Sequence, residues 1–208
     1  MTQHDDSALS NVVPAYEVDT LGAPFRVTLV DSVQIKMDEV AGKELVLIPD
    51  FVGMVNAVAR CRAIHPRKLS GDEIVFLRKA LGVKAKALAT YLDVSPEHLS
   101  RCEAGSKVLS SASERMLRLF VFLATFYESP QDLLAKLEGS EDLAEPTRKT
   151  KASSNDLGEA FLQYFLTLKI QTIFAADERL HFKLERTCRR NQRPSASGAD
   201  DGDWQKAA

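Results

Sequence analysis

Apolar and polar residues alternate with a period of two in the first part of the chain. The alternation covers residues 25–29 and resumes over residues 33–37. A period of two is typical of strands that bury one face against a core. The pattern therefore predicts a small antiparallel β unit that turns at Asp31-Ser32, with residues 44–48 as a third strand.

Helical spacing replaces this alternation after Asp50, a residue type that caps helices. A connecting helix is expected to run from there toward residue 66. Its repeating positions fall on related turns, at Phe51, Val55, Val58 and Arg62.

Between Lys68 and Tyr127 the spacing of apolar residues is helical throughout. Ser70 and Glu73 have the spacing of a capping box, and Gly82 is expected to end the helix that they begin. Further helices are expected at about residues 84–92, from residue 95, from the serines at 110–113 and, as a short fifth helix, at 129–139.

The chain breaks one short helix and at once begins another around Asp93, whose residue type tolerates a positive φ angle. Ala89 before the break is small enough to let two helices cross closely, and Leu99 and Cys102 after it are apolar anchors. Ser95 and Pro96 are typical of a helix start. The second helix should therefore present its N-terminal half outward.

The ends of the chain and one internal segment are rich in polar residues. We expect disordered tails at residues 1–15 and 189–208, with Trp204 packing on nothing, and a linker at 141–156. Between these, alternating residues in 157–188 predict a C-terminal hairpin of two strands, at about 166–175 and 178–186.

Charge is distributed unevenly, although the net charge is only −2 and 45% of residues are hydrophobic. Residues 66–120 hold ten Lys/Arg against six Asp/Glu, which gives this segment +4. The segments on either side are negative. A phosphate backbone is attracted to the basic segment, which is the one that contains the helix break.

Several classes of protein find no support in the sequence. The three cysteines and four histidines are scattered, which fits buried thiols and indicates no metal site or disulfide framework. The longest apolar run, LFVFLATF, is short for a membrane span, and no signal sequence stands at the N-terminus, so the cytoplasm is the expected compartment. Neither GxSxG nor HExxH occurs, so no enzyme and no cofactor is expected.

Residues 68–126 resemble the lambda-repressor and Cro-like (XRE) helix-turn-helix domains. The similarity lies in the run RKALGVKAKALATYLDVSPEHLSRCEAGSKVLSSASERMLRLF. It implies that the helix at 95–104 enters the major groove of DNA, with Arg101 as the guanine reader. The implied base contacts are Pro96, Glu97, His98 and Arg101, and the implied phosphate contacts are Lys84, Lys86, Ser95 and Lys107.

The same resemblance implies an ion pair between Arg78 and Glu103 with a structural role. Three positions depart from the family pattern: Ala85 replaces the glutamine that usually opens the second helix, Cys102 replaces a tryptophan, and Asp93 replaces the turn glycine. The first departure removes a contact to DNA, so base preference is expected to differ from the family's usual behaviour.

A weaker resemblance extends upstream, to two-part antitoxins and regulators of the MqsA type, in which a zinc ribbon precedes the helix-turn-helix. Such ribbons use CxxC pairs, and no such pair precedes Cys61. The resemblance therefore implies a β unit held by its apolar strands alone, without zinc.

Together these patterns predict an α+β chain. A mainly α helix-turn-helix domain of four to five helices, residues 67–140, is flanked by a small β unit with its connecting helix, residues 16–66, and by the C-terminal hairpin. The expected function is a sequence-specific DNA-binding regulator, acting as a repressor or an autoregulating antitoxin with a toxin partner. An apolar stripe on the helix that begins at the serines 110–113 is interpreted as core and is rich enough to extend into a homodimer interface: Met116, Leu119, Phe120 and Leu123.

A second function remains open at this point. The helical domain can serve as a scaffold for protein partners, in which case Arg101 is an ordinary solvated surface residue and the β units at both ends do the binding.

Overall fold

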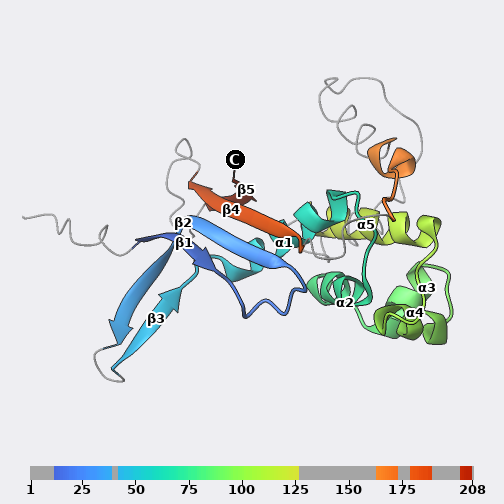
Figure 1. Ribbon diagram of the computed structural model, residues 1–208, viewed down its shortest axis with the longest axis horizontal. Coiled ribbons are helices and arrows are strands. Elements are labelled where there is room, and N and C mark those ends of the chain that lie inside the picture. The colour runs from blue at the N-terminus through green and yellow to red at the C-terminus, as the bar shows by residue number, and fades with distance from the viewer. Residues whose placement is uncertain (1–11, 39–41, 127–162, 173–178, 189–201, 208) are drawn as a thin grey trace, which may run out of the picture. The chain divides into compact units, whose positions relative to one another are not determined.

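The computed structural model describes residues 12–38, 42–126, 163–172, 179–188 and 202–207 (Figure 1). The chain is an α+β protein that divides into two compact units. The β unit is built from both ends of the chain, up to Val58 and from Arg179 onward. The helical unit contains the residues between these segments.

Five strands form the sheet of the β unit, with the order β1-β2-β4-β5 and β3 paired to β2. Strand β2 pairs in parallel with β4, and every other pairing is antiparallel. The strands are β1 (Val12–Glu17), β2 (Arg26–Asp38), β3 (Lys43–Leu47), β4 (His181–Cys188) and β5 (Gly202–Lys206). The β2–β4 pair is thus formed by residues that are far apart in the sequence.

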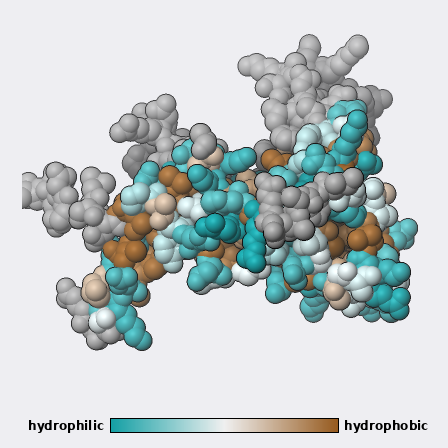
Figure 2. Space-filling view, in the orientation of Figure 1, coloured by the Kyte–Doolittle hydropathy of each residue, from teal (hydrophilic) through white to brown (hydrophobic). Residues whose placement is uncertain are grey.

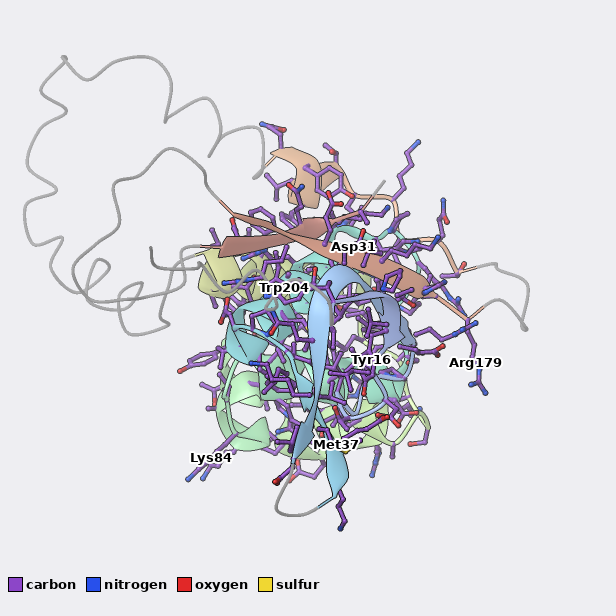
Figure 3. All side chains as sticks on the ribbon, turned by 90° about the vertical axis from the view of Figure 1, so that its left-hand side faces the viewer. Tyr16, Asp31, Met37, Lys84, Arg179 and Trp204 are labelled. Carbon is purple, nitrogen blue, oxygen red and sulfur yellow. The ribbon has the colours of Figure 1, made fainter. Side chains whose placement is uncertain are left out.

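The predicted turn at Asp31-Ser32 is wrong, because β2 runs through it as one strand of 13 residues. Asp31 has a φ of 46°, and the pairing with β1 shifts register beside it. An extra residue of this kind is a β-bulge, which changes the face on which later side chains lie. The bulge interrupts the alternation in the sequence just as a turn does (Asp31 is labelled in Figure 3).

The predicted disordered tails are also wrong where the structure describes them. Val12 begins β1, and Gly202 begins β5 at the other end of the chain. Trp204 is only 3% exposed, and its indole Nε1 donates to the Asp50 carbonyl oxygen at 3.1 Å, at the start of the first helix. A polar composition does not reveal these strands, because separate strands, β2 for β1 and β4 for β5, supply their hydrogen bonds.

The predicted C-terminal hairpin is replaced by two other structures. Residues 163–167 form a helical turn, and Gln171 exchanges backbone hydrogen bonds with the segment 66–68. Strand β4 pairs instead with β2 and β5. Local alternation fits a hairpin, but the long-range pairing buries Phe182 and Leu184 of β4 beside Val27 and Leu29 of β2.

Helix α1 (Phe51–Ile64) begins at the predicted cap, where Asp50 Oδ1 accepts from Gly53 N at 2.9 Å. Its first turns bury Met54 and Val58 in the β unit. The boundary between the units lies after Val58, inside α1, and not at the expected residue 66. The reason is Arg62, whose buried side chain bonds within the helical unit.

The four central helices agree with the predicted ones. They are α2 (Gly71–Ala80), α3 (Ala85–Tyr91), α4 (Pro96–Glu103) and α5 (Ser111–Phe126). The capping box of Ser70 and Glu73 is present at the start of α2. The predicted fifth helix at 129–139 and the linker at 141–156 lie outside the described residues.

Helix α5 buries a different face from the predicted one. Leu117 and Val121 are fully buried, whereas Met116 is 44% exposed. Phe120 is partly buried and lies edge-on to Tyr91, with ring centroids 6.1 Å apart. Leu119, Phe120 and Leu123 are partly buried, and Leu119 packs against the buried Phe122. The predicted core stripe therefore lies at the margin of the buried face, whose centre includes the ion pair of Glu114 and Arg118.

Candidate nucleic-acid interface

Helix α4 has one buried and one exposed side. Leu99 and Cys102 are 0% and 1% exposed, and they anchor the helix in the core of the helical unit. With roughly 100° between successive residues, the opposite side is the one centred on Glu97. Four exposed residues form this outward stripe: Glu97, Ser100, Arg101 and Ala104. Glu97 and Arg101 are among the base contacts that the family resemblance implies, whereas Ser100 and Ala104 are further positions of the same face, which helical periodicity indicates.

The turn between α3 and α4 explains how this stripe comes to be presented. Asp93 has a φ of 52°, as the sequence predicts. Asp93 N donates to Thr90 O at 3.2 Å and Val94 N to Ala89 O at 3.0 Å, which is the Schellman arrangement that closes a helix. Here an aspartate takes the left-handed position that glycines take after α2 and α4.

The start of α4 is capped as expected. Ser95 Oγ accepts from His98 N at 3.1 Å, and Pro96 occupies the first helical position, where it is exposed. The Ser95 hydroxyl in turn donates to the Glu97 carboxylate, a bond that lowers the pKa of that carboxyl. The predicted phosphate contact of Ser95 would therefore have to replace this bond.

His98 lies at the flank of the outward stripe and is only partly exposed. Its Nε2 lies 3.5 Å from Cys102 Sγ, on the buried side of the same helix. Burial raises the pKa of the Cys102 thiol, so the thiol stays neutral at neutral pH. The structure thus brings His98 toward the core, in contrast to Glu97 and Arg101.

The Glu97 carboxylate is fully exposed and ionised at neutral pH. Its pKa is lowered by hydrogen bonds from its own backbone amide and from Ser95, with a smaller effect of the Arg101 charge. An ionised carboxylate repels phosphate groups but accepts a hydrogen bond from the amino group of a base. In the outward stripe it therefore favours a base edge over the backbone.

Three lysines lie near the two helices: Lys84, Lys86 and Lys107. All are exposed, and within the described residues none of them, nor Arg101, has an ion-pair partner. Lys84 precedes α3 and projects outward (Figure 3). Lys107 follows α4, and its amide donates to the Arg101 carbonyl oxygen at 3.1 Å. These cations are available to an external anion.

The predicted ion pair between Arg78 and Glu103 is present. Arg78 Nε lies 2.6 Å from Glu103 Oε1, and the side chains are 17% and 15% exposed. Arg78 Nη1 also donates to Val83 O at 3.4 Å. The pair joins the end of α2 to the last residue of α4 and thus helps to orient the outward stripe.

A second, deeper ionic cluster, which the sequence patterns do not predict, supports the helices. Arg62 donates to both carboxylate oxygens of Glu73, at 2.7 and 2.8 Å, and Arg118 donates to Glu114 at 2.8 Å. Both arginines are 0% exposed and also donate to backbone carbonyl groups of the 62–68 segment. The spacing of Glu114 and Arg118, one helical turn apart, was the signal available in the sequence.

Burial acts against the charged form of Glu73, but hydrogen bonds from Arg62 and Ser70 outweigh it and keep the pKa of this carboxyl below its usual value. The charged cluster therefore persists at neutral pH. It fixes the connection between α1 and α2 and so provides a rigid base for the outward stripe.

Among the described residues, no group of three or more His, Cys, Asp or Glu is placed to hold a metal ion. None of the helices in these segments is both long and apolar enough to cross a membrane.

Comparison of the chain with protein-family models, with curated proteins and with solved structures finds no match.

Proposed function

We propose that α3, the turn at Asp93 and α4 form a helix-turn-helix that binds the major groove of double-stranded DNA. On this proposal the chain is a sequence-specific transcriptional regulator that represses by occupying its operator. The observation that carries the proposal is the outward stripe of α4, in which Glu97 and Arg101 are exposed while Leu99 and Cys102 fix the helix from behind.

The chemistry of the stripe suits base edges. The Arg101 guanidinium can donate to two acceptors of one guanine, and the Glu97 carboxylate can accept from the amino group of cytosine. The two residues are separated by about one helical turn, roughly 6 Å along the axis, so they can meet neighbouring base pairs. Ser100 and Ala104 have short side chains, which allow the helix to approach the groove floor.

The surrounding cations suit the phosphate backbone. Lys84, Lys86, Lys107 and the Ser95 hydroxyl are placed on the two helices or directly next to them, and contacts of this kind fix the register of a protein on a duplex without reading bases. The segment 66–120 carries the excess positive charge that such contacts need.

The test is a selection from random duplexes, followed by titration of the enriched sequence at several salt concentrations. Three lysine contacts per copy predict that log K falls with log salt with a slope of about −3 per copy. An enriched motif together with this slope supports the proposal. If no sequence is enriched and binding does not depend on salt, the proposal fails and the scaffold function takes its place.

The scaffold function has one observation in its favour, which is the apolar surface that the β unit exposes on strand β3. The two functions can also be combined in an autoregulating antitoxin. Such a protein holds a toxin through a flanking region while α4 binds the operator. Co-purification with a small basic protein encoded beside this chain would support the antitoxin form. If the chain purifies without such a partner, the antitoxin form is not supported and the proposed function is a repressor that acts without a toxin.

A further inference from the structure

The end of β2 and strand β3 form a two-stranded ribbon, residues 34–38 with 43–47, that exposes large apolar side chains. Met37 is 62% exposed, Leu45 48%, Leu47 42% and Val46 40%. Figure 2 shows brown, apolar surface along this part of the β unit. Such side chains are ordinarily buried, so the ribbon is an unusual apolar surface among the described residues of this unit.

The register of the ribbon places apolar residues on both of its faces. Ile35 lies opposite Val46 on one face, whereas Leu45 and Leu47 lie on the other, opposite Lys36 and Gln34. A ribbon of only two strands is marginally stable in water and gains stability from a third or fourth strand. Both faces of the ribbon therefore favour the addition of strands beside it.

One edge of the ribbon is open to such an addition. Among the described strands, β3 pairs with β2 alone, so its outer edge presents unpaired N–H and C=O groups. Native proteins usually protect such an edge with charged residues or proline. On β3 the charges are confined to the first two residues, Lys43 and Glu44, and the three that follow are apolar.

This distribution of charge suits a second copy of the same strand in antiparallel orientation. We propose that β3 pairs in antiparallel fashion with β3 of a second copy of the chain, about a two-fold axis at Val46. In this register Val46 lies opposite Val46 of the partner subunit, and Leu45 lies opposite Leu47 of the partner subunit. The charged ends of the two strands then lie at opposite ends of the pair. A parallel, in-register alignment would instead place the two Lys43 side chains opposite each other and the two Glu44 side chains opposite each other, which is unfavourable.

The resulting sheet has four strands in the order β2-β3-β3-β2. The two-fold axis pairs the open edge of β3 on both copies, so the backbone N–H and C=O groups of both edges are hydrogen-bonded. Leu45 and Leu47 of both copies form one apolar cluster on a single face. The inference does not depend on the DNA-binding proposal, because it concerns the β unit and makes no use of α4.

The first test measures the mass of the full-length chain by sedimentation equilibrium at micromolar concentration. The wild-type chain is expected to be a dimer, and the double variant Leu45→Glu/Leu47→Glu is expected to dissociate on the order of 100-fold more readily, because it places four carboxylates in the cluster. Both leucines are exposed, so the fold should survive, as far-UV circular dichroism will show.

The matched control is Met116→Glu on α5, which changes an equally exposed apolar residue in the half-exposed stripe of the helical unit. This variant is expected to remain a dimer. A wild-type monomer overturns the proposal and leaves the ribbon to a strand of a different protein. Dissociation by Met116→Glu, with the ribbon variant still dimeric, also overturns it and assigns the dimer to α5.

The second test fixes the register by crosslinking. Val46→Cys places two thiols opposite each other at the axis, within the distance that a disulfide bridges, and a covalent dimer is expected on oxidation. Met37→Cys introduces a thiol at a more exposed position on β2. It lies about 20 Å from its copy, across three strand spacings and four residues along the strands, and should give no covalent dimer beyond the wild-type background. Equal crosslinking of the two variants would contradict the strand pairing.

Discussion

Arg78 and Glu103 form a forked ion pair between α2 and α4, with Nε to Oε1 at 2.6 Å and Nη2 to Oε2 at 3.3 Å. The carboxylate belongs to the last residue of the helix that carries the outward stripe. The pair thus fixes the position of α4 from its C-terminal end, while Leu99 and Cys102 fix it from its buried side.

Removing one partner of this pair is expected to destabilise the helical unit. Arg78→Ala leaves the partly buried Glu103 carboxylate without its donor, so the free energy of unfolding should fall by about 1–3 kcal/mol. Urea denaturation measures the change. In a double-mutant cycle with Glu103→Ala, the two losses should not add, and additive losses would show that the pair contributes nothing.

Arg101 and Lys107 are expected to differ in their effect on DNA binding. Arg101→Ala should cost about 1–3 kcal/mol on the enriched duplex and relax base preference, whereas Lys107→Ala should weaken all duplexes alike and reduce the salt slope by about 1. Fluorescence anisotropy at several salt concentrations measures both effects. Lys169→Ala removes the same charge elsewhere in the helical unit and is the control; parental binding by both test variants would refute these contacts.

Gly71 is expected to tolerate no side chain, because α4 ends directly against it. A Cβ atom at this position would lie 2.4 Å from the Glu103 carbonyl oxygen and 2.7 Å from that of Cys102. Gly71→Ala must therefore displace backbone, and the loss of stability should be about 1–3 kcal/mol, with a matching loss of DNA affinity. Lys79→Ala, an exposed change on the same helix, should stay within about 0.5 kcal/mol of the parent. Equal melting temperatures of Gly71→Ala and Lys79→Ala would contradict the close approach.

His65 is expected to make the stability of the helical unit depend on pH. Burial, and then the charges of Arg62 and Arg118, lower the pKa of this histidine in the folded protein. Below about pH 6.5 the unfolded chain therefore binds more protons than the folded protein. The stability that neutral His65 contributes is complete above that pH and is lost as pH falls through the folded pKa. Calorimetry between about pH 7.5 and 5 should show a shallower fall in melting temperature for His65→Gln. If melting temperature falls with pH equally steeply in the variant and the parent, His65 does not cause the pH dependence.

Trp204 is expected to hold the C-terminal strand in the β unit. Trp204→Ala removes a side chain that is 3% exposed together with its bond to the Asp50 carbonyl group, so the cost should be about 3–5 kcal/mol. Urea denaturation followed by far-UV circular dichroism measures it. The neighbouring Gln205 is exposed, and Gln205→Ala should change little. A stability equal to that of the parent would mean that β5 adds nothing to the sheet.

Local patterns predicted the helices well. The capping box at Ser70, the cap at Ser95 and the left-handed turn at Asp93 each depend on residues that are close in sequence, and all three are present. The ion pair of Arg78 with Glu103 was implied by the family resemblance and is also present. A helix forms its hydrogen bonds within its own segment, which is why the sequence by itself determines where α2, α3 and α4 begin and end.

Only the tertiary structure decided the β unit and the buried ionic cluster. The bulge at Asp31 depends on the pairing of β2 with β1, whereas the bond of Trp204 to Asp50 and the pairing of β2 with β4 depend on partners more than 150 residues away. The sequence places Arg62 at a repeating helical position and Arg118 among the charges of the basic segment, but only the packing of three helices buries them beside Glu73 and Glu114. A strand takes its hydrogen bonds from a neighbour, and a buried charge takes its partner from another element, so neither can be deduced from the residues nearby.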